Sequence, residues 1–250
     1  MHAFGVARAV AGMALAGSVF MSAMTSAVEI AIYSFNGNNG TGNVAAAFDA
    51  DNLTAGAITR GTGVTAFART NSMAAYGWTS SGTPGANDYF QFTLTPATGY
   101  SLTLDDMIFG EQQVRNQFYA DEDAQLWAVR SSRDGYTANL ASGATTAPGS
   151  VGTHTIDLSG LGTLTSAVTF RIYGYDSSGF IFLPTINEWA LVNYDTANNY
   201  GVTVTGDVAL IPEPGAGLCL ALGGAALLCR RRSRRRDHGS AATAATPAAA

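Results

Sequence analysis

Several separate stretches of the chain alternate hydrophobic and polar residues with a period of two. In residues 88–95, Phe90, Phe92 and Leu94 are separated by glutamine and threonine. Residues 168–173 and 201–210 repeat the pattern, with β-branched or aromatic residues at every second position. Successive side chains of a strand point to opposite faces of a sheet, so this period is typical of sheets with one buried and one solvent-exposed face. The pattern predicts an all-β domain.

Shorter hydrophobic runs extend this pattern over most of the chain. Further strands are predicted at residues 30–35, 101–104, 107–111, 125–131, 154–158 and 180–183. Turn signals such as Asn36-Gly37 and Asp134-Gly135 separate them, and the polar residues 37–63 predict one or two edge strands and a long loop. Since no sustained 3.6-residue period is present, we expect an antiparallel, jelly-roll-like β-sandwich over residues 28–210.

Charge is distributed unevenly along the chain. The net charge is −5, but six of the thirteen basic residues, all of them arginines, lie within residues 230–236. Residues 28–214 contain six arginines and seventeen acidic residues, which gives a net charge of about −11. Because an acidic domain repels nucleic acid and anionic lipid, we expect no nucleic-acid partner.

The first 27 residues have the organisation of a secretory signal peptide. Arg8 supplies a positive charge, and residues 9–21 form an Ala-rich apolar run that is too short to span a bilayer comfortably. Small side chains follow at Thr25 and Ala27. We expect cleavage after Ala27 and export of the remaining chain.

The C-terminal end consists of three parts in a fixed order. Pro212 and Pro214 flank Glu213, which keeps the backbone extended there. Residues 215–229 carry no charge and predict a short transmembrane helix of about 22 Å, less than the ~30 Å hydrocarbon core. A cluster of arginines follows directly: Arg230, Arg231, Arg232, Arg234, Arg235 and Arg236. These arginines are expected to stay cytoplasmic, which leaves residues 28–210 outside the membrane.

This three-part end, together with the signal peptide, resembles the PEP-CTERM sorting tail. In that family an exosortase, a membrane-embedded cysteine transpeptidase, recognises the tail and removes it near the Pro-Glu-Pro motif. The resemblance implies that Pro212, Glu213 and Pro214 are the sorting motif of residues 211–236, that the arginines are the stop-transfer cluster, and that membrane anchoring is transient. A permanent, uncleaved anchor is the alternative.

Two further features accompany this resemblance. Residues 237–250 continue past the arginines as an Ala/Thr-rich segment, where members of the family usually end. We expect a disordered cytoplasmic extension; a misplaced stop codon is the alternative. Residues 87–100, 130–143 and 168–175 resemble the β-sandwich ectodomain common among proteins with this tail, which implies a location and a fold but no particular activity.

The sequence offers little support for catalysis. His154 is the one histidine of residues 28–210, and it is in phase with Ile156 and Leu158, which indicates a partly buried structural residue. Asp105 and Asp106 are neighbours on a predicted strand, so their side chains point to opposite faces and do not share a cleft. A Ser-His-Asp triad stays open, because its members need not be close in sequence. We expect no enzymatic activity.

Two kinds of ligand remain as hypotheses for the exported domain. Calcium binds six to eight oxygens, and Asp121 and Asp123 are the candidate ligands, although no EF-hand spacing is present. No other cofactor is indicated. Sugars stack on exposed aromatic rings, and the candidate platforms are Trp78, Trp127 and Trp189, with Tyr76, Tyr136, Tyr173 and Tyr175.

These observations together predict an exported cell-surface or extracellular-matrix protein. Its expected role is structural or adhesive, in the cell envelope or in exopolysaccharide, and its expected partners are an exosortase-like transpeptidase, the membrane and extracellular polysaccharide. A carbohydrate-binding module is the alternative, and a secreted hydrolase is a more distant one.

Overall fold

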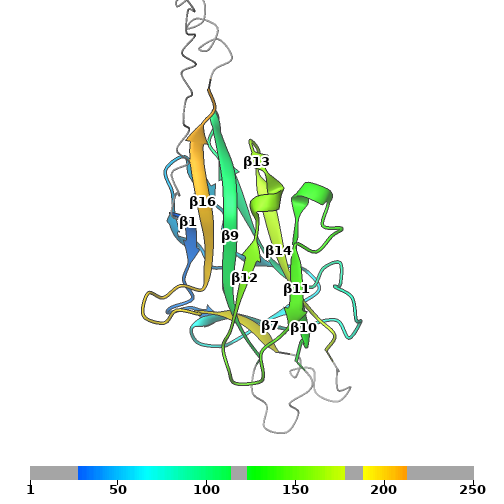
Figure 1. Cartoon of the computed structure of the whole chain (residues 1–250). Helices are drawn as coiled ribbons and strands as arrows, with labels where there is room; N and C mark the ends of the chain where they lie inside the picture. Colours follow the sequence, from blue (N-terminus) through cyan, green and yellow to red (C-terminus); the bar gives the residue numbers. More distant parts are fainter. Residues whose placement is uncertain (1–27, 114–122, 178–187, 213–250) are drawn as a thin grey trace, which may run out of the picture.

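The computed structural model describes residues 28–113, 123–177 and 188–212. These residues form sixteen β-strands and two short 3-10 helices, and they contain no α-helix. The strands pair into two sheets, so the prediction of an all-β domain is confirmed and a sandwich fits the two layers (Figure 1). The jelly-roll order stays a prediction.

The first sheet is built on the long strand β9 (Tyr100–Gln113). One side of β9 pairs with β15 and β16, and the other side pairs with β12 and β13. The remaining strands of this sheet have the following bounds: β1 (Val28–Tyr33), β2 (Asn39–Gly40), β3 (Ala46–Asp49), β6 (Thr65–Phe67), β7 (Ser72–Tyr76), β12 (Gly152–Asp157), β13 (Thr163–Leu164), β15 (Trp189–Val192) and β16 (Val202–Leu210). Their main order is β2-β7-β15-β9-β16-β1-β3.

The second sheet has β14 and β8 at its centre, and its order is β11-β10-β14-β8-β4, with β5 also paired to β8. Its strands are β4 (Leu53–Ala55), β5 (Thr59–Arg60), β8 (Tyr89–Pro96), β10 (Leu126–Ser131), β11 (Ala141–Ala144) and β14 (Val168–Tyr175). The 3-10 helices are η1 (Ser132–Asp134) and η2 (Ser159–Leu161). Apart from the short parallel pair β2–β7, the described strand pairs are antiparallel, as expected.

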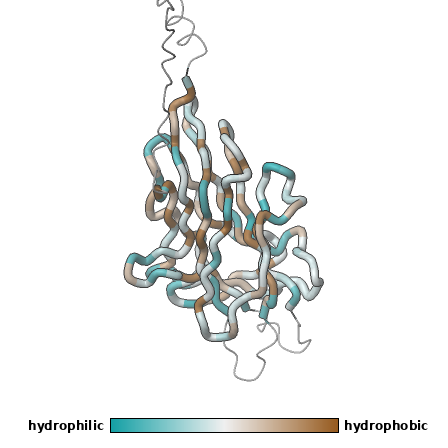
Figure 2. Tube along the Cα trace, in the orientation of Figure 1, coloured by the Kyte–Doolittle hydropathy of each residue, from teal (hydrophilic) through white to brown (hydrophobic). Residues whose placement is uncertain are grey.

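The alternation in the sequence explains how the two sheets pack. Phe90, Phe92 and Leu94 of β8 are buried, as are Phe170 and Ile172 of β14, which pairs with it. The polar positions between them are half-exposed on the outer face of the second sheet. Figure 2 shows the result along the chain, with hydrophobic residues recurring within the strands and hydrophilic residues concentrated in the loops.

Aromatic rings from both sheets meet in the core. Tyr33 of β1 lies 5.2 Å from Phe92 of β8, and Phe109 of β9 lies 5.3 Å from Trp127 of β10 (ring centroids). Burying large apolar side chains is the main favourable contribution to folding, and these rings account for much of it here. The core is therefore one continuous layer between the sheets.

Two strand predictions differ from the structure. Residues 101–104 and 107–111, expected as two strands, belong to the single strand β9, because a β-bulge at Asp105 and Asp106 interrupts the alternation without ending the strand. Residues 37–63 contain four short strands instead of one or two. The predicted strand at 180–183 lies outside the described residues.

Strand β16 leads directly into the predicted sorting motif. Its last residue, Leu210, is followed by Ile211, whose backbone N–H donates to the carbonyl oxygen of Gly99 at 2.8 Å. Pro212 is exposed. Glu213, Pro214, the predicted transmembrane residues 215–229, the arginine cluster and residues 237–250 lie outside the described residues, as does the predicted cleavage site at Ala27. Within the part of the chain that the structure describes, no helix has the length and hydrophobicity needed to cross a bilayer.

Candidate ligand-binding site

The three tryptophans predicted as sugar platforms lie in the core. Trp78 is 2% exposed, Trp127 is 6% exposed and Trp189 has no exposed surface. Trp78 and Trp189 pack edge to face with ring centroids 5.2 Å apart. The prediction that these rings stack on sugars is therefore wrong. The alternation already indicated this for Trp127, which is in phase with Val129, an inward-facing residue of β10.

The candidate calcium ligands are not brought together in the described structure. Asp121 lies outside the described residues. Asp123 is buried, and its Oδ1 accepts the backbone N–H of Glu188 at 2.8 Å. Among residues 28–113, 123–177 and 188–212, no group of three or more metal-ligating side chains has the proximity needed to hold an ion. Calcium binding stays a hypothesis without support from this geometry.

His154 lies at the edge of the core, where the sequence predicts it. Its ring packs against Trp127 and Phe109, with centroids 4.5 and 5.1 Å away. Its Nε2 lies 3.3 Å from Oε1 of Glu111, a carboxylate buried between the sheets. Glu111 also accepts the indole N–H of Trp189 at 2.8 Å and the backbone N–H of Thr146 at 2.7 Å. Both oxygens of Glu111 already accept hydrogen bonds from the protein. The arrangement therefore serves to hold strands together.

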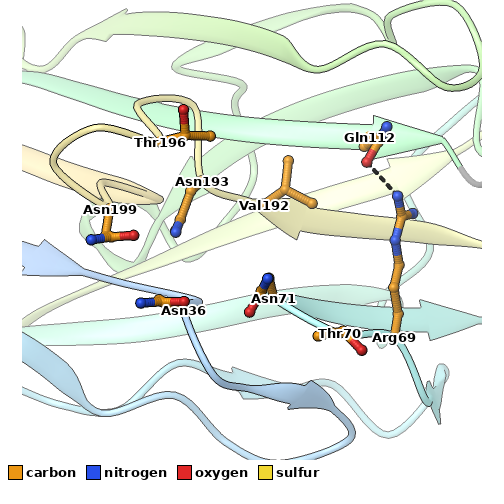
Figure 3. A pocket seen from close by; sticks show the side chains of 9 residues that line it. All are labelled: Asn36, Arg69, Thr70, Asn71, Gln112, Val192, Asn193, Thr196 and Asn199. Atoms are coloured by element: carbon orange, nitrogen blue, oxygen red, sulfur yellow. Dashed lines mark hydrogen bonds between the residues drawn. The ribbon is translucent and has the colours of Figure 1, made fainter.

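A polar pocket of about 270 Å³ lies on the outer face of the first sheet (Figure 3). Four asparagines, a glutamine, two threonines, an arginine and one valine line it. The valine and the glutamine, Val192 and Gln112, come from β15 and β9, and the other residues come from the loops at the ends of β1, β7 and β15. We call this site the amide pocket.

The local backbone explains why asparagines occupy the pocket rim. Asn71 and Asn199 have φ values of 57° and 60°. This left-handed conformation is strained for most residues, and asparagine tolerates it better than others do. Asp195 fixes the loop that carries Asn199, because its Oδ1 accepts the backbone N–H groups of Ala197 and Asn198. Hydrogen bonds lower the pKa of Asp195. The largest contribution comes from the side chain of Asn198, followed by the backbone N–H groups.

Two of the amides present hydrogen-bond donors to the pocket. Oδ1 of Asn193 accepts the backbone N–H of Phe35, and Oδ1 of Asn71 accepts the backbone N–H of Gly37, both at 2.9 Å. Each side chain thus keeps its NH2 group for a ligand. The side chains of Asn36 and Thr196 make no hydrogen bond to the described protein residues, so they can donate or accept. Such a mixture matches the hydroxyl and ring oxygens of a sugar.

Arg69 closes one end of the amide pocket. Its Nη2 donates to Oε1 of Gln112, and its Nη1 is buried without a hydrogen-bond partner (Figure 3). Burial lowers the pKa of Arg69, and the nearby carboxylates Glu188 and Asp123 oppose this shift. Burial likewise raises the pKa of Glu188 to about 7, against the attraction of Arg69. The guanidinium is therefore held at the pocket by a neutral glutamine and by the attraction of two carboxylates.

Sequence reasoning missed the amide pocket. Asn36, Asn71, Asn193 and Asn199 are spread over most of the chain, and no local motif connects them. The one signal was the occurrence of asparagine beside glycine or other turn residues, which predicts a turn and not a site.

Comparisons with known proteins give little further information. No protein-family model and no curated protein matches the chain. A solved structure that it resembles is the C-terminal domain of a chitobiase from Bacteroides fragilis, with 10% sequence identity and a TM-score of 0.29. The similarity covers 64% of this chain and 96% of that domain. A TM-score this low supports no conclusion about fold or function.

Proposed function

We propose that this chain is an exported adhesive protein of the cell surface or extracellular matrix that binds polysaccharide through the amide pocket. The observation that carries the binding role is the pocket's lining of amide and hydroxyl side chains, of which Asn36 and Thr196 make no side-chain hydrogen bond within the described residues. Its volume is near the lower end of the range for small-molecule sites and suits one sugar residue. No described constellation of nucleophile and base accompanies it, so we propose binding and not catalysis.

The export and sorting steps of the proposal depend on the two ends of the sequence. The signal peptide, the Pro212-Glu213-Pro214 motif, the apolar stretch and the arginine cluster support delivery by an exosortase-like transpeptidase. The exposed position of Pro212, two residues beyond the end of β16, supports access of such an enzyme to the motif.

Binding at the pocket is tested with the double variant Asn36→Ala, Thr196→Ala on an array of neutral oligosaccharides. These two side chains make no hydrogen bond to the described protein, so their removal should leave the fold intact. A hydrogen bond contributes about 1 kcal/mol, and losing two should weaken binding about tenfold or more.

The matched control is Thr62→Ala, which removes an exposed threonine hydroxyl away from the pocket. It should bind like the unaltered chain. Unchanged array binding by the pocket double variant, or no binding by the unaltered chain to any glycan, would contradict the proposed role of the pocket.

The sorting step is tested by mass spectrometry of the protein secreted by a host that contains an exosortase. The mature chain is expected to begin near Val28 and to end near the Pro-Glu-Pro motif. A Glu213→Ala variant is expected to retain its tail. Detection of residues 215–236 on the mature unaltered protein would contradict processing.

A further inference from the structure

The outer face of the second sheet carries a cluster of tyrosines and arginines, far from the amide pocket in the fold. Tyr89 of β8 pairs with Tyr173 of β14, and their rings are 5.6 Å apart. Two residues before Tyr173 on β14, and on the same face of the sheet, Arg171 pairs directly with Arg130 of β10. With Tyr136, which follows η1, these residues form what we call the arginine–tyrosine surface.

The guanidinium of Arg171 is fixed between two aromatic rings. Its Cζ lies 4.0 Å from the ring centroid of Tyr89 and 3.8 Å from that of Tyr136. Its Nε donates to Oε1 of Gln91 at 3.2 Å. Within the described residues neither Nη atom has an acceptor, and neither is among the buried unpaired atoms. The Nη atoms of Arg171, a half-buried residue, therefore keep contact with solvent in a fixed orientation.

Arg130 is held in a similar manner by neutral groups. Its Nε donates to Oδ1 of Asn139 at 2.7 Å, and its Nη1 donates to the carbonyl oxygen of Tyr136 at 3.1 Å. Its Cζ lies 5.3 Å from the ring centroid of Tyr173. Stacking and hydrogen bonding remove most of the side-chain entropy that a binding arginine would otherwise lose.

The charges of this arginine pair are not neutralised by the described protein. Like charges directly opposite on paired strands destabilise a sheet. Residues 28–214 carry seventeen acidic side chains, yet within the described part of the chain no carboxylate lies at ion-pair distance from Arg130 or Arg171. A bound anion would relieve this repulsion, and the forked guanidinium geometry suits a carboxylate best.

We propose that the arginine–tyrosine surface binds the carboxylate groups of an acidic polysaccharide, a polymer of the uronic-acid type. The anion site stands on its own geometry, whereas the choice of a polysaccharide rests on the proposed function. The surrounding domain has a net charge of about −11, which opposes every polyanion. It opposes a nucleic acid most, because duplex DNA carries one charge per about 1.7 Å whereas a uronic-acid polymer carries one carboxylate per sugar residue. A uronic-acid polymer also presents sugar faces that can lie against the half-exposed Tyr136.

The test measures binding of polygalacturonate to the full chain in a non-ionic detergent. The tail arginines would bind any polyanion, so arginines within residues 230–236 are replaced by glutamine in every protein compared. The double variant Arg130→Gln, Arg171→Gln is expected to lose at least about 30-fold in affinity. Arg171→Lys keeps the charge but loses the fork, and we expect about a tenfold loss.

The pocket variant Asn36→Ala, Thr196→Ala serves as the control that separates the two sites. It should bind polygalacturonate normally even though it loses neutral sugars, so failure of one proposal is distinguishable from failure of the other. If the arginine double variant does not fold, the affinity of Arg171→Lys for polygalacturonate alone tests the proposed anion site.

Several results would overturn the proposal. Failure of the parent protein to bind polygalacturonate would do so, as would equal affinity of the parent and Arg171→Lys for it. Tighter binding of dextran sulfate than of polygalacturonate would point to sulfate as the ligand group. Tighter binding of double-stranded DNA would point to nucleic acid.

Discussion

At the scale of the residue, Glu111 shows how a polar side chain is placed in a hydrophobic core. Its two oxygens accept hydrogen bonds from Trp189 and from the backbone of Thr146, and His154 lies at 3.3 Å. A buried polar group is tolerated when it is paired, and each of its donors would be costly to leave unpaired.

Replacing Glu111 with alanine should therefore be strongly destabilising. The change leaves the indole N–H of Trp189 and the backbone N–H of Thr146 without an acceptor, and we expect a loss of about 3 kcal/mol in the free energy of unfolding. Glu111→Gln keeps one acceptor oxygen and should cost less. Urea denaturation measures both. Glu29→Gln, at a half-exposed glutamate, is the matched control, and an equal loss there would contradict this account.

The raised pKa of Glu188 predicts a dependence of stability on pH. Its pKa rises from 4.5 to about 7 on folding, mainly because of burial and in spite of Arg69. Between these values the folded chain binds more protons than the unfolded chain. Stability from this group is thus fully present below pH 4.5 and is lost as pH rises through about 7, by an amount on the order of 2 kcal/mol once the shift is discounted for screening by solvent.

Thermal denaturation between pH 4.5 and 8 tests this prediction. The melting temperature of the unaltered chain should fall relative to that of Glu188→Gln as pH rises, because glutamine does not titrate. Parallel curves for the two proteins would show that Glu188 titrates normally in the folded state.

The sequence predicted the partial burial of His154 but not the burial of the three tryptophans, and it did not predict the site. The phase of His154 with Ile156 correctly indicated a partly buried histidine. By contrast, the amide pocket needs Asn36 and Asn193 side by side, and Arg171 becomes a binding candidate only beside Tyr136 and Arg130. These contacts depend on strand pairing and loop geometry, which alternation within one segment does not encode.

At the scale of the element, the bulge in β9 explains why the sequence predicts two strands where one exists. Leu104 pairs with Gly206 and Met107 with Val204, so Thr205 alone lies opposite Asp105 and Asp106. The extra residue shifts the alternation by one position, which period-two reasoning interprets as an end of the strand. The hydrogen bond from the backbone N–H of Asp106 to Oγ1 of Thr205, at 3.1 Å, supports the bulge.

Strand β14 contains a glycine that the tryptophan pair requires. A Cβ atom at Gly174 would lie 2.9 Å from Trp189, and 3.1 Å from both Trp78 and Ala124. Since these contacts are tighter than van der Waals distance, Gly174→Ala should push the rings apart and destabilise the fold by about 1–3 kcal/mol. Urea denaturation and near-UV circular dichroism of the tryptophans measure the effect. Gly160→Ala has open space around it and is the control; equal stability of the two variants would contradict this packing.

At the scale of the whole molecule, the two proposed binding surfaces lie on opposite outer faces of the sandwich. The amide pocket opens beside β15 and β9 of the first sheet, and the arginine–tyrosine surface covers β8, β14 and β10 of the second. One surface suits neutral sugar groups and the other suits carboxylates. With both proposed sites in one chain, two different polymers would be held at once, as the proposed adhesive role requires.

This arrangement predicts that the protein cross-links a mixture of two polysaccharides. Adding the chain, with the tail arginines replaced as above, to polygalacturonate and the best neutral polymer from the array should raise the viscosity of the mixture. The pocket double variant and the arginine double variant each keep one site, so neither should do so. An equal mixture of the two variants should fail as well, because both sites must be present in one molecule for a bridge to form. Thickening by that mixture would indicate aggregation of the protein and not bridging by a single chain.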